Sequence, residues 1–167
     1  MGLLSWFREI TFNRTCNSLA EFQAYVPKLA TPERLAAWID SNLWYVDGSP
    51  AWRPLEDIFA VRDSFERQYG TCSECACVAM EGLRILGYQS LIARIEGEDA
   101  DRKKVAHVAA CFSKPGIRGY VNWQYAKQWP ASEPWQKLIL TVSPCDTWLA
   151  TRVSWCDMQG NRVVGLS

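Results

Sequence analysis

Apolar side chains in the first 43 residues recur at intervals of three and four, which is the spacing of one face of an α-helix. The first such stretch lies within residues 5–30, predicts one or two short amphipathic helices and ends at Pro27. The second begins at Thr31-Pro32, where the hydroxyl can cap a helix and proline can occupy its first turn. Its apolar stripe consists of Leu35, Trp38, Ile39 and Leu43. The pattern predicts a helical lead-in over residues 1–43.

Three further elements precede the strands. Residues 47–50, Asp-Gly-Ser-Pro, predict a turn, and a short loop and a helix reaching Phe65 should follow it. The next helix has the clearest boundaries, because Gly70 permits a sharp entry, Thr71 can cap the first N–H groups and Gly87 provides a left-handed stop. We expect this helix to run from Cys72 to Leu86.

From Tyr88 onward the hydrophobic period changes from 3.6 to 2, which is typical of β-strands. The charged run 96–104 predicts a solvated hairpin loop, and residues 114–119 predict a turn. Short connections of this kind favour an antiparallel meander. The predicted class is therefore α+β, with N-terminal helices packed on an antiparallel sheet. The strand candidates are residues 88–95, 105–112, 120–124, 137–142, 148–155 and 162–166.

Composition adds limits on size, location and partners. The chain has 167 residues, of which 49% are hydrophobic and 13% aromatic, so we expect one globular domain over residues 1–167. Its 18 basic and 18 acidic residues cancel, which argues against a nucleic-acid or anionic-membrane partner. The apolar start, residues 1–7, is broken by Arg8 and Glu9, so no signal peptide or membrane span is predicted. We expect a cytoplasmic protein with reduced thiols.

A cysteine, a histidine and an asparagine occur in an order that suggests catalysis. Cys72 falls in the first turn of the predicted helix 72–86, where free N–H groups and the helix dipole favour a thiolate and a lowered pKa. His107 is the only histidine, and Asn122 follows on the next predicted strand. Cross-strand neighbours have Cβ atoms about 5 Å apart, so a contact between His107 and Asn122 is feasible. These residues would supply a nucleophile, a proton acceptor and a group that fixes the imidazole tautomer. The pattern predicts a Cys-His-Asn triad.

Each of these residues also has a structural explanation. A free cysteine is often a small core residue, a lone histidine on an apolar strand is often a core residue too, and Asn122 can satisfy the backbone of a turn.

The spacing of Cys72, Cys75 and Cys77 suggests a metal site, for which Cys111, His107 or Cys145 would be a distant fourth ligand. Successive helical positions diverge by about 100°, however, so the three thiols should not converge on one ion. We expect no metal and no other cofactor.

The order of these motifs resembles the transglutaminase-like superfamily within the papain-like fold. The resemblance covers about residues 44–125, which it implies are the catalytic core, and residues 126–167 would add C-terminal strands. Two positions depart from the family pattern, because Thr71 and Asn122 stand where an acidic residue and an aspartate are usual. The motifs are Gly70-Thr71-Cys72, Leu86-Gly87-Tyr88, His107, Asn122-Trp123 and, upstream, the segments 44–47 and 52–56, which resemble the lead-in of bacterial transglutaminase-like cysteine peptidases.

This resemblance implies acyl transfer through a thioester. His107 would take the thiol proton, Cys72 would attack an amide or ester carbonyl, and the Cys72 N–H with Trp52 would hold the oxyanion. We expect a cysteine peptidase or amidase, or a transglutaminase-type amine transferase, acting on a peptide or other amide-containing substrate such as a protein. Two alternatives are an acyl-CoA-dependent N-acyltransferase, resembling arylamine N-acetyltransferases, and a non-catalytic binding or assembly module that the departures at Thr71 and Asn122 keep open.

Overall fold

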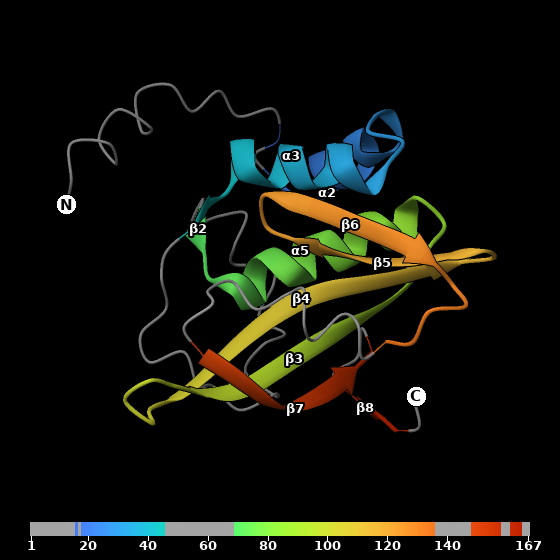
Figure 1. The fold of residues 1–167 in the computed structure, drawn as a ribbon. Coiled ribbons are helices and arrows are strands. Elements are labelled where there is room, and N and C mark those ends of the chain that lie inside the picture. Colours follow the sequence, from blue (N-terminus) through green and yellow to red (C-terminus); the bar gives the residue numbers. More distant parts are fainter. Residues whose placement is uncertain (1–15, 17, 46–68, 136–147, 158–160, 165–167) are drawn as a thin grey trace.

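The protein forms helices packed on a six-stranded antiparallel sheet (Figure 1). The structure is a computed structural model, and it describes residues 16, 18–45, 69–135, 148–157 and 161–164. The predicted α+β class is therefore confirmed. The helices are α2 (Leu19–Tyr25), the 3-10 helix η1 (Val26–Lys28), α3 (Pro32–Asn42) and α5 (Cys72–Ile85). The strands are β1 (Trp44–Tyr45), β2 (Tyr69–Gly70), β3 (Gln89–Asp99), β4 (Lys104–Lys114), β5 (Ile117–Asn122), β6 (Tyr125–Pro130), β7 (Trp148–Cys156) and β8 (Arg162–Val163).

The helical lead-in follows its sequence signals where the structure describes it. The Thr31 hydroxyl accepts a hydrogen bond from the Arg34 N–H at 3.3 Å, and Pro32 opens α3 as predicted. The four residues of the predicted stripe are all buried. The predicted turn at 47–50, the helix reaching Phe65 and the strand at 137–142 lie outside the described residues. None of the described helices is long and apolar enough to cross a membrane.

Helix α5 is bounded almost as predicted. It ends at Ile85, one residue before the expected position, and Gly87 takes a left-handed conformation with a φ angle of 77°. At its start the Glu74 carboxylate accepts hydrogen bonds from the Thr71 N–H, at 2.7 Å, and from the Thr71 hydroxyl. This reciprocal cap fixes the first turn of the helix. The parallel pair β1–β2 leads directly into this turn, because Gly70 pairs with Tyr45.

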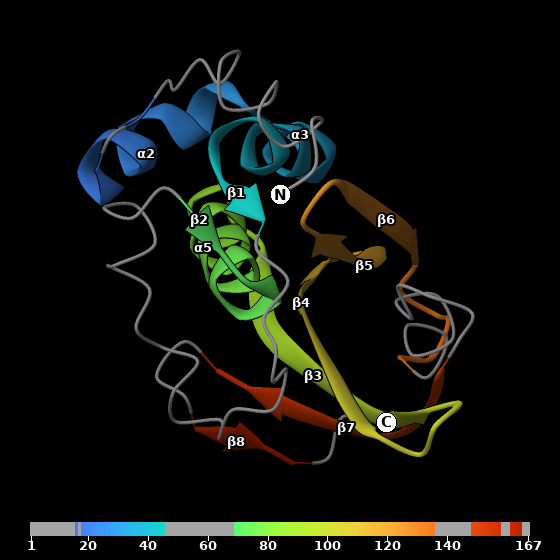
Figure 2. The ribbon, with the colours of Figure 1, turned by 90° about the vertical axis from the view of Figure 1, so that its left-hand side faces the viewer.

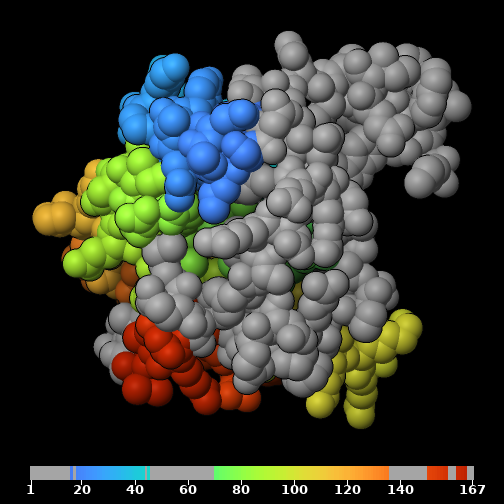
Figure 3. All heavy atoms as spheres, turned by 180° about the vertical axis from the view of Figure 1, so that it is seen from behind, coloured from blue at the N-terminus to red at the C-terminus, as the bar shows by residue number. Residues whose placement is uncertain are grey.

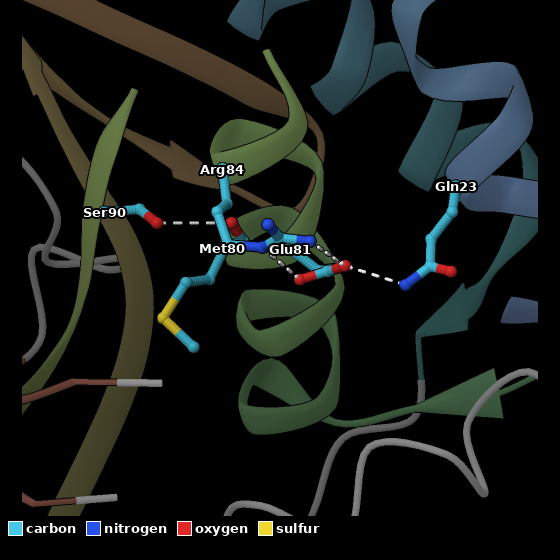
Figure 4. A network of polar contacts seen from close by, with 5 residues as sticks. All are labelled: Gln23, Met80, Glu81, Arg84 and Ser90. Atoms are coloured by element: carbon cyan, nitrogen blue, oxygen red, sulfur yellow. Dashed lines mark hydrogen bonds and ion pairs between the residues drawn. The ribbon is translucent and has the colours of Figure 1, made fainter. Parts of the chain in front are cut away.

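Polar contacts attach α5 to its neighbours (Figure 4). The Gln23 side chain on α2 donates to the Glu81 carboxylate at 2.8 Å. Arg84 also donates to this carboxylate through Nε and Nη2, at 3.0 and 2.9 Å, and mainly these bonds lower the Glu81 pKa. On the sheet side, the Ser90 hydroxyl donates to the Met80 carbonyl at 3.2 Å. The orientation of α5 is thus fixed against both α2 and β3.

The sheet has the strand order β6-β5-β4-β3-β7-β8, with every pair antiparallel. The predicted meander is confirmed for β3 to β5, and β6 continues it. The prediction of a loop over residues 96–104 is wrong, because β3 runs to Asp99 and β4 starts at Lys104. The hairpin end, yellow in Figure 3, projects from the molecule, and residues 101–104 are exposed. Strand β5 begins at Ile117, three residues early, because only Pro115 and Gly116 form the turn.

Both faces of the sheet are buried, and strand alternation separates two cores. Helix α5 covers one face (Figure 2), which we call the helical face. The opposite face, which we call the aromatic face, packs around tryptophan and tyrosine rings. Sheet residues of the helical face are Ile92, Val108, Ala110, Phe112, Val121 and Cys156. Those of the aromatic face are Ala93, Ile95, Ala109, Cys111, Tyr120 and Trp155, joined by Trp135.

Candidate active site

Cys72 is the first residue of α5 and packs, half-buried, at the edge of the core on the helical face. Hydrogen bonds from the Val108 backbone and from the side chain and backbone of Ser73 reach its sulfur and lower the thiol pKa. Burial has the larger effect and raises that pKa above its ordinary value. The predicted lowering of the Cys72 pKa is therefore wrong, because desolvation of the thiolate outweighs the hydrogen bonds at the helix start.

His107 and Asn122 form a direct pair. The His107 Nε2 atom lies 2.7 Å from the Asn122 Oδ1 atom, and the two side chains are buried, with exposed fractions of 7% and 8%. Asn122 ends β5, which pairs with β4 from Ala110 to Lys114. Both side chains alternate with residues of the helical face, so they project toward the aromatic face. Two residues 15 positions apart thus meet through the β4–β5 hairpin.

Tyr125 completes this pair, and the sequence reasoning missed it. The Asn122 Nδ2 group donates to the Tyr125 hydroxyl at 3.0 Å, so the Oδ1 atom is the one that faces His107. An amide oxygen only accepts, and His107 must therefore carry its proton on Nε2 and leave Nδ1 as the basic nitrogen. The only available signal was the spacing of Asn122 and Tyr125, which flank a two-residue connection between β5 and β6.

The charge state of His107 follows from its burial. Desolvation lowers the His107 pKa below its ordinary value of 6.5, and the hydrogen bond with Asn122 partly offsets this by favouring the charged ring. The shift therefore favours the neutral imidazole. In this tautomer the Nδ1 lone pair of the neutral ring can accept a proton, which is the role expected of a general base.

The side chains of Cys72, on α5, and His107, on β4, lie on different faces of β4. The Cys72 sulfur is hydrogen-bonded by the backbone of Val108, the residue that follows His107. Val108 precedes the part of β4 that pairs with β5, which begins at Ala110. In the described part of the chain, no hydrogen bond joins this sulfur to the His107 ring. The structure therefore brings His107 and Asn122 into contact. It places the Cys72 sulfur, which belongs to α5, against the backbone of Val108, the next residue of β4 after His107.

Two other predictions concern the surroundings of the site. Trp52, the expected oxyanion residue, lies outside the described residues. Trp123, next to Asn122, stacks on Tyr45 with ring centroids 4.4 Å apart, and its φ angle is 41°. This stacking ties the β5–β6 connection to β1, and β1 in turn pairs with the strand that leads into Cys72. The two halves of the candidate site are thus joined through an aromatic pair.

No cluster of metal ligands occurs in the described ranges. No three His, Cys, Asp or Glu side chains among those residues converge to hold an ion. The six described cysteines are free thiols, and all except Cys72 are buried: Cys16, Cys75, Cys77, Cys111 and Cys156.

No protein-family model matches the chain, and no curated protein matches it significantly. The resemblance to the transglutaminase-like superfamily thus depends on the sequence motifs quoted above.

Proposed function

We propose that this protein carries out thiol-dependent acyl transfer through Cys72, His107 and Asn122, in a papain-like, transglutaminase-like arrangement. The carrying observation is the 2.7 Å hydrogen bond between His107 and Asn122, together with a half-buried thiol that is hydrogen-bonded by the backbone of Val108, the residue after His107. The substrate class is a peptide or another amide. Hydrolysis, as in a cysteine peptidase or amidase, follows if water resolves the thioester, and amine transfer follows if an amine does.

The residues would divide the chemistry as follows. Asn122 holds the Nε2–H of His107, so that Nδ1 would accept the thiol proton while the Cys72 sulfur attacks the carbonyl carbon. This transfer requires the two side chains, which lie on different faces of β4, to come into contact. Because burial raises the Cys72 pKa and lowers that of His107, the resting pair is a neutral thiol and a neutral imidazole. Proton transfer therefore accompanies attack. Backbone N–H groups at the start of α5 would stabilise the oxyanion, and the protonated His107 then gives its proton to the leaving group.

The second candidate is a non-catalytic binding or assembly module on the same fold. Two observations favour it. Burial raises the Cys72 pKa, which opposes the thiolate that a cysteine nucleophile needs. His107 also projects from the face of β4 opposite to the one that carries α5. In this case the His107–Asn122–Tyr125 chain satisfies buried polar groups and has no role in catalysis.

Acyl-enzyme formation with an activated ester distinguishes the two candidates. Wild type incubated with p-nitrophenyl acetate should gain one acetyl group on Cys72, detected by intact mass and peptide mapping. Cys72→Ala and His107→Ala should abolish this almost completely, and Cys77→Ala, a buried position on the same helix, should leave it unchanged. Folded wild type that acquires no acetyl group from any activated ester or amide supports the non-catalytic module.

A further inference from the structure

Helix α5 begins with a pair of thiols separated by two residues. Cys72, Ser73, Glu74 and Cys75 are its first four residues. The two cysteines differ in accessibility, because Cys72 is half-buried whereas Cys75 is 1% exposed. Burial is the main cause that raises the Cys75 pKa, and the neighbouring charges of Cys72, Glu74 and Cys77 raise it further.

Helix geometry permits a bond between these sulfurs. Residues three apart have Cα atoms about 5 Å apart, given a rise of about 1.5 Å and a turn of about 100° per residue, and disulfides span about 4.4–6.8 Å. Their Cβ atoms are about 5–6 Å apart, which is wider than a disulfide prefers, so the first turn must tighten. The turn that must tighten is the one closed by the first helical bond, from the Cys75 N–H to the Thr71 carbonyl, at 3.0 Å.

The third thiol on the helix is placed differently. Cys77 is five residues after Cys72, which turns it about 140° away around the helix axis, and it is buried. Cys75 and Cys77 are only two residues apart and point in nearly opposite directions. Only Cys72 and Cys75 therefore combine an accessible sulfur with a buried one on the same side of the helix.

We propose that Cys72 and Cys75 form a reactive dithiol that exchanges with low-molecular-weight disulfides and closes to an intrahelical disulfide. Cys72 loses its proton to solvent, and the thiolate attacks a disulfide RSSR, which forms a mixed disulfide and releases RS⁻. Cys75 then loses its proton and attacks the Cys72 sulfur, which releases the second RS⁻. Two protein thiols are oxidised, and one RSSR is reduced to two RSH. This exchange does not depend on acyl transfer, although the disulfide would reversibly occupy the proposed nucleophile.

The bond should be labile. A disulfide that tightens a helical turn is strained, and strained disulfides have more oxidising potentials than structural ones. The buried Cys75 would react only with the adjacent sulfur, because its raised pKa and its burial protect it from outside disulfides. The helix start would therefore provide an accessible attacking thiol and a protected resolving thiol.

The test oxidises the full-length folded protein with glutathione disulfide, blocks the remaining thiols and maps the products by mass. Trypsin releases residues 68–84 as one peptide that contains all three cysteines, and cleavage after Glu74 separates Cys72 from Cys75. The two halves should stay linked, with loss of two hydrogens, and dithiothreitol should separate them. Cys77→Ser should behave like wild type, whereas Cys75→Ser should accumulate glutathione on Cys72.

Three results would overturn the proposal. The first is wild type in which glutathione remains on Cys72 as fully as in Cys75→Ser. The second is a linkage that is lost in Cys77→Ser. The third is folded wild type in which Cys72 does not react with the disulfide at all, although the unfolded chain does. None of these results bears on acyl-enzyme formation, which is measured separately under reducing conditions.

Discussion

Replacing Asn122 should change the pKa of His107 in a direction set by the new side chain. The Asn122 Oδ1 atom lies 2.7 Å from the imidazole, and the hydrogen bond raises the His107 pKa against the larger lowering by burial. In Asn122→Asp a carboxylate takes this place, and it can also accept a bond from the Tyr125 hydroxyl. In Asn122→Ala the hydrogen bond is lost, and only desolvation still acts on the His107 pKa. Tyr125→Phe is the matched control, because it leaves the amide oxygen in place.

The size of each effect follows from the burial of the pair. An opposite charge in contact raises the pKa by about 1–3 units, which corresponds to about 1.4–4 kcal/mol. Asn122→Ala should lower the pKa further and destabilise the fold by about 1–3 kcal/mol, since it leaves a buried N–H without a partner. Tyr125→Phe should have a smaller effect on stability, about 1 kcal/mol, and should leave the His107 pKa nearly unchanged.

The pH dependence of stability should change sign between wild type and Asn122→Asp. In wild type the pKa of His107 is depressed in the folded state. The contribution of His107 to the free energy of unfolding is therefore present above about pH 6.5 and is lost as the pH falls through the folded pKa. In Asn122→Asp the folded pKa is raised, so the contribution is present below about pH 6.5 and is lost as the pH rises through the folded value. Each slope can reach about 1.4 kcal/mol per pH unit.

The assay is an NMR titration of the Hε1 signal together with urea unfolding from pH 5 to 8. His107 is the only histidine in the chain, so the signal needs no assignment by mutation. The expected order of pKa values is Asn122→Ala lowest, then wild type with Tyr125→Phe, then Asn122→Asp. A wild-type pKa at or above 6.5, or an unchanged value in both Asn122 variants, would refute the described burial and pairing of His107.

Three further predictions concern α5. Iodoacetamide should label Cys72 before the other described cysteines, as the only one not buried, and labelling should accelerate toward alkaline pH because burial raises its pKa; mass mapping that finds another of these thiols first would contradict this. Glu74→Ala should cost about 1 kcal/mol in urea unfolding by removing the cap on Thr71, and Glu74→Gln should keep most of it. Gly82→Ala should destabilise the fold by up to about 2 kcal/mol, because an added Cβ would lie 2.7 Å from the buried Leu35 Cδ1. This value is the cost of crowding, about 1–3 kcal/mol, less the helix-propensity gain of about 1 kcal/mol. An unchanged urea midpoint would argue against this packing.

Helix boundaries could be predicted because their signals are local. Thr31-Pro32 starts α3, and Thr71 and Gly87 bound α5, so each boundary is set by residues within one turn of it. The Glu74 half of the cap was also readable from the Thr-x-x-Glu spacing. Strand β6 was not predicted, since it is a largely exposed edge strand without a clear hydrophobic alternation. The position of β7 beside β3 depends on pairing between residues that are 49 (Asp99 and Trp148) to 64 (Ile92 and Cys156) positions apart, which no local pattern encodes.

The site was only partly predictable for a related reason. The meeting of His107 and Asn122 follows from a short hairpin, which sequence spacing indicates. Which face of β4 meets α5 does not follow, because the residues after His107 are apolar in both alternating sets and both faces are buried. The pKa of Cys72 likewise depends on how deeply tertiary packing buries the sulfur, whereas the sequence indicates only its place at a helix start.

The central claim is that His107 acts on the Cys72 thiol, and the pH profile of Cys72 alkylation tests it most directly. In wild type, the rate should show an inflection at the His107 pKa measured by NMR, because only the neutral ring can accept the thiol proton. In His107→Gln, the inflection should disappear, and the rate should rise only with the raised pKa of the thiol itself. Superimposable profiles in the two folded proteins would contradict the claim and leave Cys72 and His107 as separate core residues.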